Sequence, residues 1–254
     1  NRLELIAQLR RAITDDEFCL YFQPKLNLRT NSINQAEVLL RWNHPTHGLI
    51  APGAFIELAE QTGMIRDITR LVLKQTYAII NLCANQNIRL SVNLSAMDLE
   101  DFSLIDFMQH MHSKQPDASR HIVLEITESA AMRDPEQALD ILNQLAAMHF
   151  QIAVDDFGTG YSSLSYLKKF QVDVLKIDKS FVHEMLTDRG DMEIVKAVIS
   201  LAQSMNLQLI AEGIEQEAEK DKLLELGCQM GQGYFFSKPL SAEDFKTYLR
   251  QECC

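Results

Sequence analysis

Strand-like and helical segments alternate along most of this chain of 254 residues. Short apolar runs lie at 90–94, 122–127, 151–154, 172–177, 208–211 and 233–236, and most of the gaps between them read as helices. Parallel strands need a crossover of a dozen or more residues, so this spacing is typical of βα units. The number of units favours a closed α/β barrel over a doubly wound open sheet, and α/β barrels commonly reach this length as one domain.

The first two apolar runs depart from that pattern. They cover 19–28 and 33–42 and are separated only by Arg29-Thr30-Asn31-Ser32. A gap this short holds no crossover helix, so we expect the two strands to pair antiparallel. The predicted architecture is therefore an α/β barrel with an irregular, antiparallel beginning.

Helix boundaries are marked by capping residues. Pro52 is expected to open a helix that Gly63 closes, and Asp134 with Pro135 provides an N-cap and a proline at the first helical position. Ser241 is expected to cap the last helix.

Charge and composition limit the class of partner. The 24 basic and 35 acidic residues give a net charge of −11, and no run of Lys or Arg marks a face for long nucleic acid. A small anionic ligand is compatible with this charge if metal ions or a local Arg/Lys pair offset the carboxylates.

The cysteines and the hydropathy indicate a compartment. The five cysteines form no Cys-x-x-Cys pair, which fits a reducing cytoplasm. No apolar run approaches the roughly 18 residues that a membrane span needs. We expect one soluble cytoplasmic domain, 1–254, without membrane contact of its own, excised from a longer multidomain protein whose other regions are free to carry a membrane anchor.

Polar residues stand at or just after the ends of nearly all the predicted strands, where apolar runs stop: Glu37, Asn93, Glu125, Asp155, Asp156, Lys176, Glu212 and Gln232. The gaps of 125 − 93 = 32, 155 − 125 = 30 and 212 − 176 = 36 residues each approximate one βα unit. In a barrel, the carboxyl ends of parallel strands form the face that carries active sites. These side chains are therefore predicted to converge at one mouth.

The chemistry of this set points to a hard cation. Carboxylate and amide oxygens without a supporting set of His or Cys suit Mg²⁺, Mn²⁺ or Ca²⁺ better than zinc. Adjacent Asp155 and Asp156 reach one site only where their strand is ending. Two ions sharing a carboxylate can clamp the oxygens of a phosphodiester under hydrolysis, with Lys176 as a positive donor nearby.

Longer strings in the same regions resemble the EAL-domain family over essentially the whole chain. They are YFQP at 21–24, AEVLLRWNHP at 36–45, VNLS at 92–95, LEITES at 124–129, VDDFGTGYSSL at 154–164, DVLKIDKSFV at 173–182, IAEGIE at 210–215 and QGYFFSKPL at 232–240. The resemblance implies a modified TIM barrel with an antiparallel first strand. It also implies a metal-dependent phosphodiesterase that hydrolyses cyclic di-GMP to linear pGpG, acting as a homodimer.

The resemblance assigns roles to individual residues. The implied ligands of one or two Mg²⁺ or Mn²⁺ ions are Glu37, Asn93, Glu125, Asp155 and Asp156. The implied catalytic residues around the hydrolytic water are Lys176, Glu212 and Asp156, and which of them is the general base stays open. The implied substrate-binding and supporting residues are Gln23, Leu39, Arg41, Asp178, Glu215 and Gln232. Glu128 matches a residue that anchors the loop after Asp156.

Two departures and one alternative accompany the resemblance. Val38 replaces the central alanine of the signature and should face away from the metal; Gln229 stands where the family often has Asp and is expected to tune the site. Ca²⁺ fits the same oxygen cage and is expected to inhibit, because a larger, loosely held ion orients the attacking water less well. The alternative function is a catalytically silent EAL module that binds cyclic di-GMP as a sensor; the complete acidic set favours the enzyme.

Overall fold

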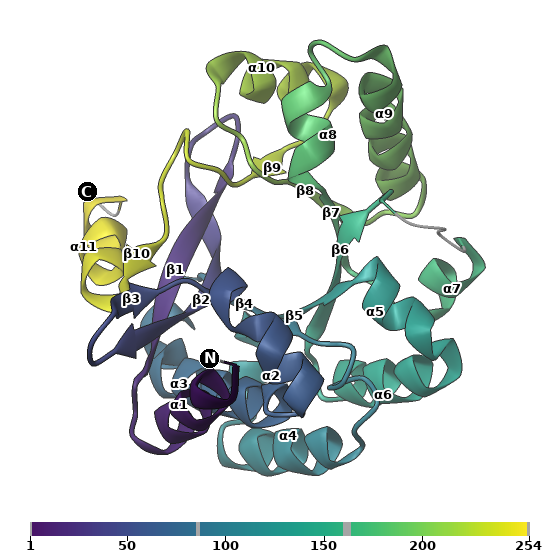
Figure 1. Cartoon of the computed structure of the whole chain (residues 1–254). Helices are drawn as coiled ribbons and strands as arrows, with labels where there is room; N and C mark the ends of the chain where they lie inside the picture. Colours follow the sequence, from purple (N-terminus) through teal and green to yellow (C-terminus); the bar gives the residue numbers. More distant parts are fainter. Residues whose placement is uncertain (1, 85–86, 160–163, 253–254) are drawn as a thin grey trace.

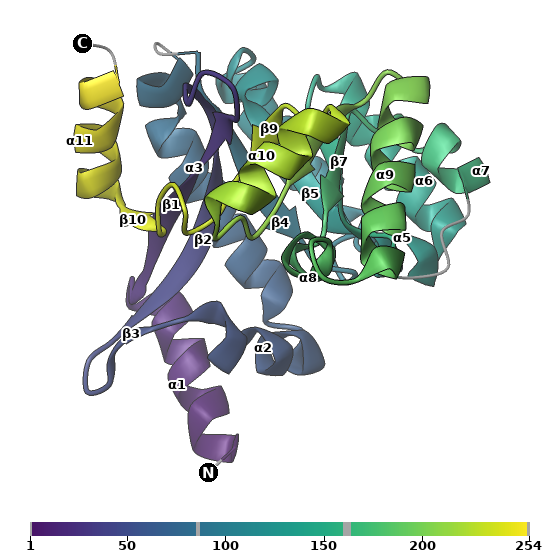
Figure 2. The ribbon, with the colours of Figure 1, turned by 90° about the horizontal axis from the view of Figure 1, so that it is seen from above.

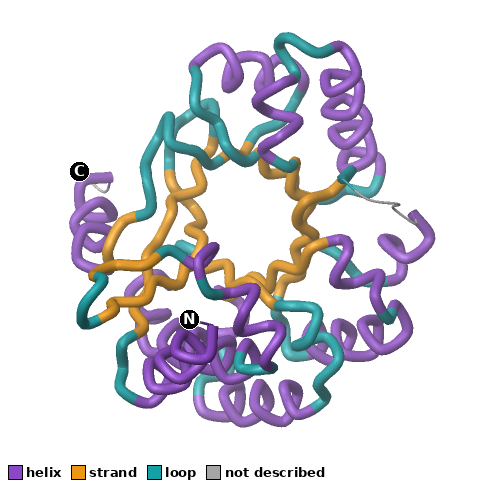
Figure 3. Tube along the Cα trace, in the orientation of Figure 1, coloured by secondary structure: helices purple, strands orange, loops and turns teal. Residues whose placement is uncertain are grey.

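The computed structural model describes residues 2–84, 87–159 and 164–252. Its centre is a ring of strands seen end-on in Figures 1 and 3. In ring order the strands are β1 (Phe18–Asn27), β2 (Ile33–His44), β4 (Arg89–Leu94), β5 (Ile122–Thr127), β6 (Gln151–Phe157), β7 (Val174–Ile177), β8 (Gln208–Ala211) and β9 (Met230–Gly231). Strand β9 returns to β1, which closes the barrel.

Strand direction confirms the irregular beginning. Strand β1 pairs antiparallel with β2, from Phe18 opposite Trp42 to Leu26 opposite Ile33, and antiparallel with β9. From β2 through β9 all neighbouring strands of the ring are parallel. Two short strands, β3 (Gly48–Ile50) and β10 (Leu240–Ser241), extend the sheet at β2 and β1. The molecule is thus an eight-stranded barrel of the TIM type in which the first strand is reversed.

Helices surround the ring (Figure 1). They are α1 (Arg2–Thr14), α2 (Ile56–Thr62), α3 (Ile65–Ala84), α4 (Ser103–Lys114), α5 (Glu128–Arg133), α6 (Pro135–Ala147), α7 (Leu164–Lys169), α8 (Lys179–Glu184), α9 (Arg189–Ser204), α10 (Glu217–Leu226) and α11 (Ala242–Glu252), with single 3₁₀ turns at Pro52–Ala54 and Ala118–His121. Helix α1 projects beyond the strand ends beside α2 (Figure 2). Among the described residues, no helix combines the length and apolarity needed to cross a membrane.

The predicted caps at Asp134 and Ser241 and the predicted end at Gly63 are confirmed. Pro52 does not open α2, because Phe55, with a φ of −139°, separates the 3₁₀ turn Pro52–Ala54 from the helix that begins at Ile56. Asp134 accepts a hydrogen bond from the N–H of Gln137 at the start of α6, and Ser241 Oγ accepts one from Asp244 at the start of α11. Gly63 ends α2 in a left-handed conformation.

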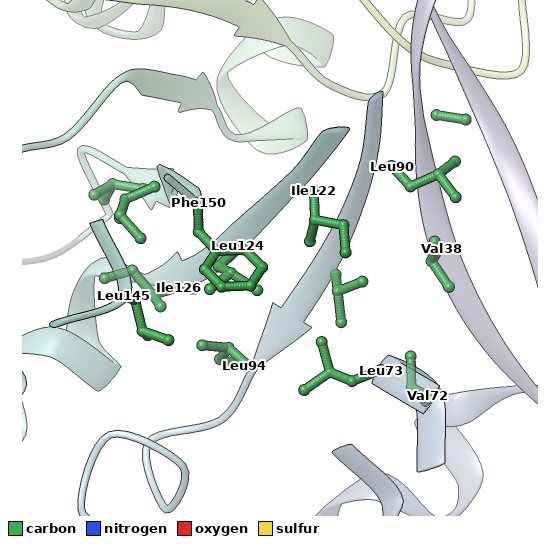
Figure 4. Packing of buried hydrophobic residues seen from close by; sticks show 14 of the residues in the cluster. Val38, Val72, Leu73, Leu90, Leu94, Ile122, Leu124, Ile126, Leu145 and Phe150 are labelled. Atoms are coloured by element: carbon green, nitrogen blue, oxygen red, sulfur yellow. The ribbon is translucent and has the colours of Figure 1, made fainter. Parts of the chain in front are cut away.

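The main core fills the space between the barrel and its helices. Outward residues of the strands, among them Val38, Leu90 and Leu124, pack against α3 and α6 through Leu73 and Leu145 (Figure 4). Alternate residues of the same strands point into the ring. There a second, smaller cluster is formed by Val123, Ala153, Val174, Ile210 and Met230. Polar residues two positions further along these strands therefore also point inward, toward the barrel mouth.

The strand predicted at 233–236 is wrong. The chain forms the short β9 just before it and then turns, with the N–H of Phe236 bonded to the carbonyl of Gly233. A Cβ on Gly233 would lie 2.0 Å from the backbone oxygen of Ile214, so the turn is packed against another loop. The apolar residues of this segment reflect contacts of a turn, which periodicity does not distinguish from a short strand.

Candidate active site

The predicted strand-end residues meet around the ammonium group of Lys176. This side chain of β7 is fully buried, and its Nζ lies 2.5 Å from Glu125 Oε2, 2.7 Å from Asp155 Oδ2 and 2.5 Å from Glu212 Oε1. Glu37 Oε2 lies 4.0 Å away. Burial disfavours the charged lysine, but the four carboxylates outweigh it and hold the pKa of Lys176 well above its ordinary value. Lys176 is therefore a permanent cation at the centre of the site.

Amide side chains connect the carboxylates on one side of this centre. Asn93 Nδ2 donates to Glu37 Oε1 at 2.8 Å. Gln232 Nε2 donates to Glu37 Oε2 at 2.7 Å and to Glu212 Oε1 at 3.2 Å. The middle of β2, the end of β4 and the loops after β8 and β9 are thereby joined in one hydrogen-bonded network.

Asp155 and Asp156 share the site because the strand is irregular there. The register between β6 and β7 shifts between Val154 and Phe157, and Asp156 has a φ of 53°, in the left-handed region. This turns the Asp156 side chain toward Asp155 instead of to the opposite face. Burial, the Asp155 charge and a hydrogen bond with Asp178 raise the pKa of Asp156 to about 6. Strand β6 ends at Phe157, directly after Asp156, which confirms the prediction that the strand is ending there, and the irregularity lies in its last residues.

The acidic cluster fits a divalent cation. Asp155, Asp156 and Glu212 each offer an oxygen atom, and these atoms lie within 4.8 Å of one another. Burial, together with neighbouring carboxylates, raises the pKa of Glu212 to about 8 in spite of Lys176. Burial likewise raises the pKa of Asp155. Carboxylates held this close need a cation to ionise fully, and oxygen donors of this kind suit Mg²⁺ or Mn²⁺.

Sequence reasoning missed Lys25 in β1. It is fully buried, and its Nζ forms an ion pair with Glu125 Oε1 and lies 2.8 Å from Ser91 Oγ. Burial opposes ionisation of Glu125, but Lys176 and Lys25 prevail and lower its pKa to about 2. The available signal was a lysine in the apolar run at 19–28, since a charged side chain is almost never fully buried unless it is paired.

Of the residues predicted for substrate binding, Gln232 belongs to the central network, and the others lie at the rim of the mouth or outside that network. Leu39 lines a cavity of about 270 Å³ together with Asn93 and Ser95. Gln23 Nε2 donates to the Ser237 carbonyl at 3.3 Å, and the Arg41 guanidinium lies 5.4 Å from the centre of the Tyr21 ring.

Asp178 and Glu215 play different parts. Asp178 caps α8 by accepting from the N–H of Ser180 at 2.9 Å and also contacts Asp156. Glu215 is more than half exposed and lies 3.8 Å from His183, so the structure does not bring it into the carboxylate network.

Glu128 contacts the segment that follows Asp156. This first residue of α5 is buried, and its Oε2 accepts a hydrogen bond from the N–H of Gly158 at 3.3 Å. The loop continues into 160–163, which lies outside the described residues.

The two departures from the family signature lie away from the carboxylates. Val38 is buried in the outer core and faces away from the site, as expected. Gln229 is exposed before β9 and lines a groove with Asn34 and Gln208, near the beginnings of β2 and β8. This groove opens at the opposite end of the strands from the mouth, so Gln229 does not contact the carboxylates, and its effect on the site stays a prediction.

A barrel whose first strand is reversed and whose mouth carries this acidic cluster defines a class of proteins. Comparisons with known proteins identify that class. The family model described as EAL domain matches residues 6–239, and the chain belongs to this family. It is 42% identical over 248 residues to a bifunctional diguanylate cyclase/cyclic di-GMP phosphodiesterase, MucR, of Pseudomonas aeruginosa, covering 95% of this chain and 36% of that protein. It is 38% identical to the cyclic di-GMP phosphodiesterase NbdA of the same species, covering 98% and 32%.

Solved structures agree with this family. The chain superimposes on the PaMucR phosphodiesterase in complex with c-di-GMP with a TM-score of 0.91, at 40% identity, covering 95% of this chain and 99% of that one. The FimX EAL domain from Pseudomonas aeruginosa bound to c-di-GMP gives a TM-score of 0.86 at 30% identity, covering 95% and 98%. The chain spans about a third of the length of the curated relatives named above.

Proposed function

We propose that residues 1–254 form one EAL domain that hydrolyses cyclic di-GMP to linear pGpG with Mg²⁺ or Mn²⁺. The observation that carries this proposal is the convergence of Glu37, Glu125, Asp155 and Glu212 on one buried lysine at the barrel mouth. The relatives named as cyclic di-GMP phosphodiesterases and the structures named as c-di-GMP complexes support this substrate. We further propose that the domain works in the reducing cytoplasm. We also propose that it forms a homodimer, as the family resemblance implies.

The donor set would hold the metal through Asp155 and Asp156, with Glu37, Asn93 and Glu125 beside them. A divalent ion in such a site polarises the phosphate and makes a bound water acidic. The same donors would serve one ion or two, because the adjacent carboxylates of Asp155 and Asp156 belong to one cluster.

The residues around the metal divide the remaining tasks. Lys176 stays protonated, which makes it a donor to the water or phosphate and unsuited as a base. Glu212 and Asp156 offer carboxylate oxygens beside the candidate metal position, where either would accept a proton from water. Arg41 and Leu39 at the rim would contact the phosphate and the base of the nucleotide.

Turnover is the direct test. The purified chain is incubated with cyclic di-GMP and Mg²⁺ or Mn²⁺, and pGpG is followed by chromatography. We expect pGpG to accumulate, and Ca²⁺ to suppress it. Tight binding of cyclic di-GMP without pGpG under both ions would refute the enzyme and support the silent sensor.

A further inference from the structure

A second buried cation lies inside the barrel, and the reaction proposed above does not require it. Lys25 is fully buried in β1, where it pairs with Gln35 of β2. Its side chain reaches across the barrel interior to Ser91 of β4 and Glu125 of β5. Burying an ammonium group is costly unless it is paired, so this contact is a built feature of the interior.

The two oxygens of Glu125 are held by two different lysines. Oε1 forms the ion pair with Lys25, and Oε2 lies 2.5 Å from Lys176 Nζ. Lys176 also contacts Asp155 and Glu212, so Oε2 faces the other candidate metal ligands. Lys25 contacts Ser91, which is not a candidate ligand, so Oε1 faces away from them.

The way in which a carboxylate binds discriminates between divalent ions. Mg²⁺ demands near-octahedral geometry with short metal–oxygen distances, and one oxygen per carboxylate suits it. Ca²⁺ takes six to eight oxygens, and it often draws both oxygens of one carboxylate. Both oxygens of Glu125 contact an ammonium group, but only the Lys25 contact, backed by Ser91, holds an oxygen on the side away from the other candidate ligands. That contact opposes the turning of the carboxylate that would bring both oxygens to one ion.

We propose that Lys25 is a positioning residue that sets the metal preference of this site. By holding Oε1 away from the other candidate ligands, it opposes coordination through both oxygens of Glu125, which would favour Mg²⁺ or Mn²⁺ over Ca²⁺. The inference rests on the metal site of the proposed function and adds what selects the ion. Residues at one remove from a metal commonly change its affinity by about 10- to 100-fold.

The charge of Lys25 and its hold on Glu125 Oε1 affect the metal dissociation constants in different ways. Removing the positive charge of Lys25 strengthens the binding of every divalent cation by about the same factor, since the ions carry equal charge. Freeing Oε1 benefits only the ion that uses both oxygens. The ratio of dissociation constants, Kd(Ca²⁺)/Kd(Mg²⁺), therefore isolates the geometric effect.

The experiment measures this ratio by isothermal titration of the metal-free chain with MgCl₂ and CaCl₂. The variants are Lys25→Met, which keeps the length of the side chain without its charge, and Ser91→Ala, which removes the second partner of Lys25. Lys196→Met on the half-exposed face of α9 is the matched control. We expect the ratio to fall about tenfold in Lys25→Met, to fall less in Ser91→Ala, and to stay unchanged in Lys196→Met.

The outcomes separate this inference from the proposed function. An unchanged ratio in folded Lys25→Met overturns the inference; if that variant does not fold, an unchanged ratio in Ser91→Ala does so. A shifted ratio in a protein that produces no pGpG supports the role of Lys25 and refutes the phosphodiesterase. A wild-type chain that binds neither ion overturns both.

Discussion

At the scale of single residues, the site depends on charge balance within a small buried volume. Five carboxylates, Glu37, Glu125, Asp155, Asp156 and Glu212, face two ammonium groups, Lys25 and Lys176. Burial, and then the excess of negative charge, raises the pKa values of Asp156 and Glu212. The same negative charge attracts divalent cations.

Replacing Asp155 by alanine should abolish metal binding and turnover together. Asp155 contacts Lys176 and lies within the cluster formed with Asp156 and Glu212, so its loss removes a shared ligand. We expect the affinity for Mn²⁺ to fall by at least about 100-fold. Residues that only support a ligand change metal affinity by about 10- to 100-fold, and the loss of a ligand itself should exceed this range. Titration calorimetry and the pGpG assay measure both effects, with exposed Asp221→Ala as the control. Retained activity in Asp155→Ala would show that the site is misassigned.

At the scale of elements, two strand ends and the loops after them decide how the site is held. Helix α5 begins at Glu128, directly after β5, and thereby brings that carboxylate under the segment that follows Asp156. The turn after β9 is held by Gly233 against Ile214.

Replacing Glu128 by alanine should lower turnover more than substrate binding. It removes the acceptor for the Gly158 N–H beside the bulge that orients Asp156. A hydrogen bond to a charged group contributes about 1.5 kcal/mol or more, so we expect kcat to fall roughly tenfold with KM nearly constant. Steady-state kinetics provide the test, and Asp140→Ala on the exposed face of α6 is the control. An unaltered kcat would exclude this coupling.

Replacing Gly233 by alanine should destabilise the fold. Its Cβ would lie 2.0 Å from the Ile214 oxygen, whereas a Cβ on Gly53 meets nothing within 4 Å. Overpacking of this kind costs about 1–3 kcal/mol, so we expect denaturant unfolding to show that loss for Gly233→Ala. Gly53→Ala should remain within about 0.5 kcal/mol of the wild type. Equal stability of the two variants would mean that the turn relaxes freely.

The loop after β4 should carry a dependence of stability on pH. Asp98 belongs to this loop and is buried. It accepts hydrogen bonds from Ser95 and Thr69, and burial raises its pKa above the ordinary 3.8. The folded state then binds a proton more strongly than the unfolded state. The stabilising contribution of protonated Asp98 to the free energy of unfolding is therefore full at pH values below 3.8 and is lost as the pH rises through the raised pKa. Against Asp98→Asn, which cannot ionise, the relative unfolding free energy of the wild type should decrease from acidic to neutral pH. A constant difference would contradict the raised pKa.

At the scale of the whole molecule, the barrel closes around its acidic mouth, so metal binding should stabilise the entire fold. An ion that binds only the folded state at 100 times its Kd adds about 2.7 kcal/mol. For a chain of this size we expect Mg²⁺ to raise the Tm by roughly 5 to 10 °C over the chelator-treated protein. Calorimetry of wild type and Asp155→Ala tests this, since the variant should show no shift. Equal shifts in both would place the ion elsewhere.

The order of most strands and helices, the reversed first strand and the carboxylates that interrupt the apolar runs could be predicted from the sequence. These features are local: a four-residue gap excludes a helix, and a carboxylate interrupting an apolar run is visible because burying it is costly. The caps at Asp134 and Ser241 follow from the same local chemistry.

Which charges meet could not be predicted in this way, because it depends on how distant segments pack. Lys25 and Glu125 are 100 residues apart, and closure of the ring brings β1 within reach of β5. The bulge at Asp156, the turn at Gly233 and the placement of Glu215 outside the network depend in the same way on neighbours from distant segments. A local pattern shows that a side chain is polar or apolar; the packing of segments far apart in the chain decides which partner it finds.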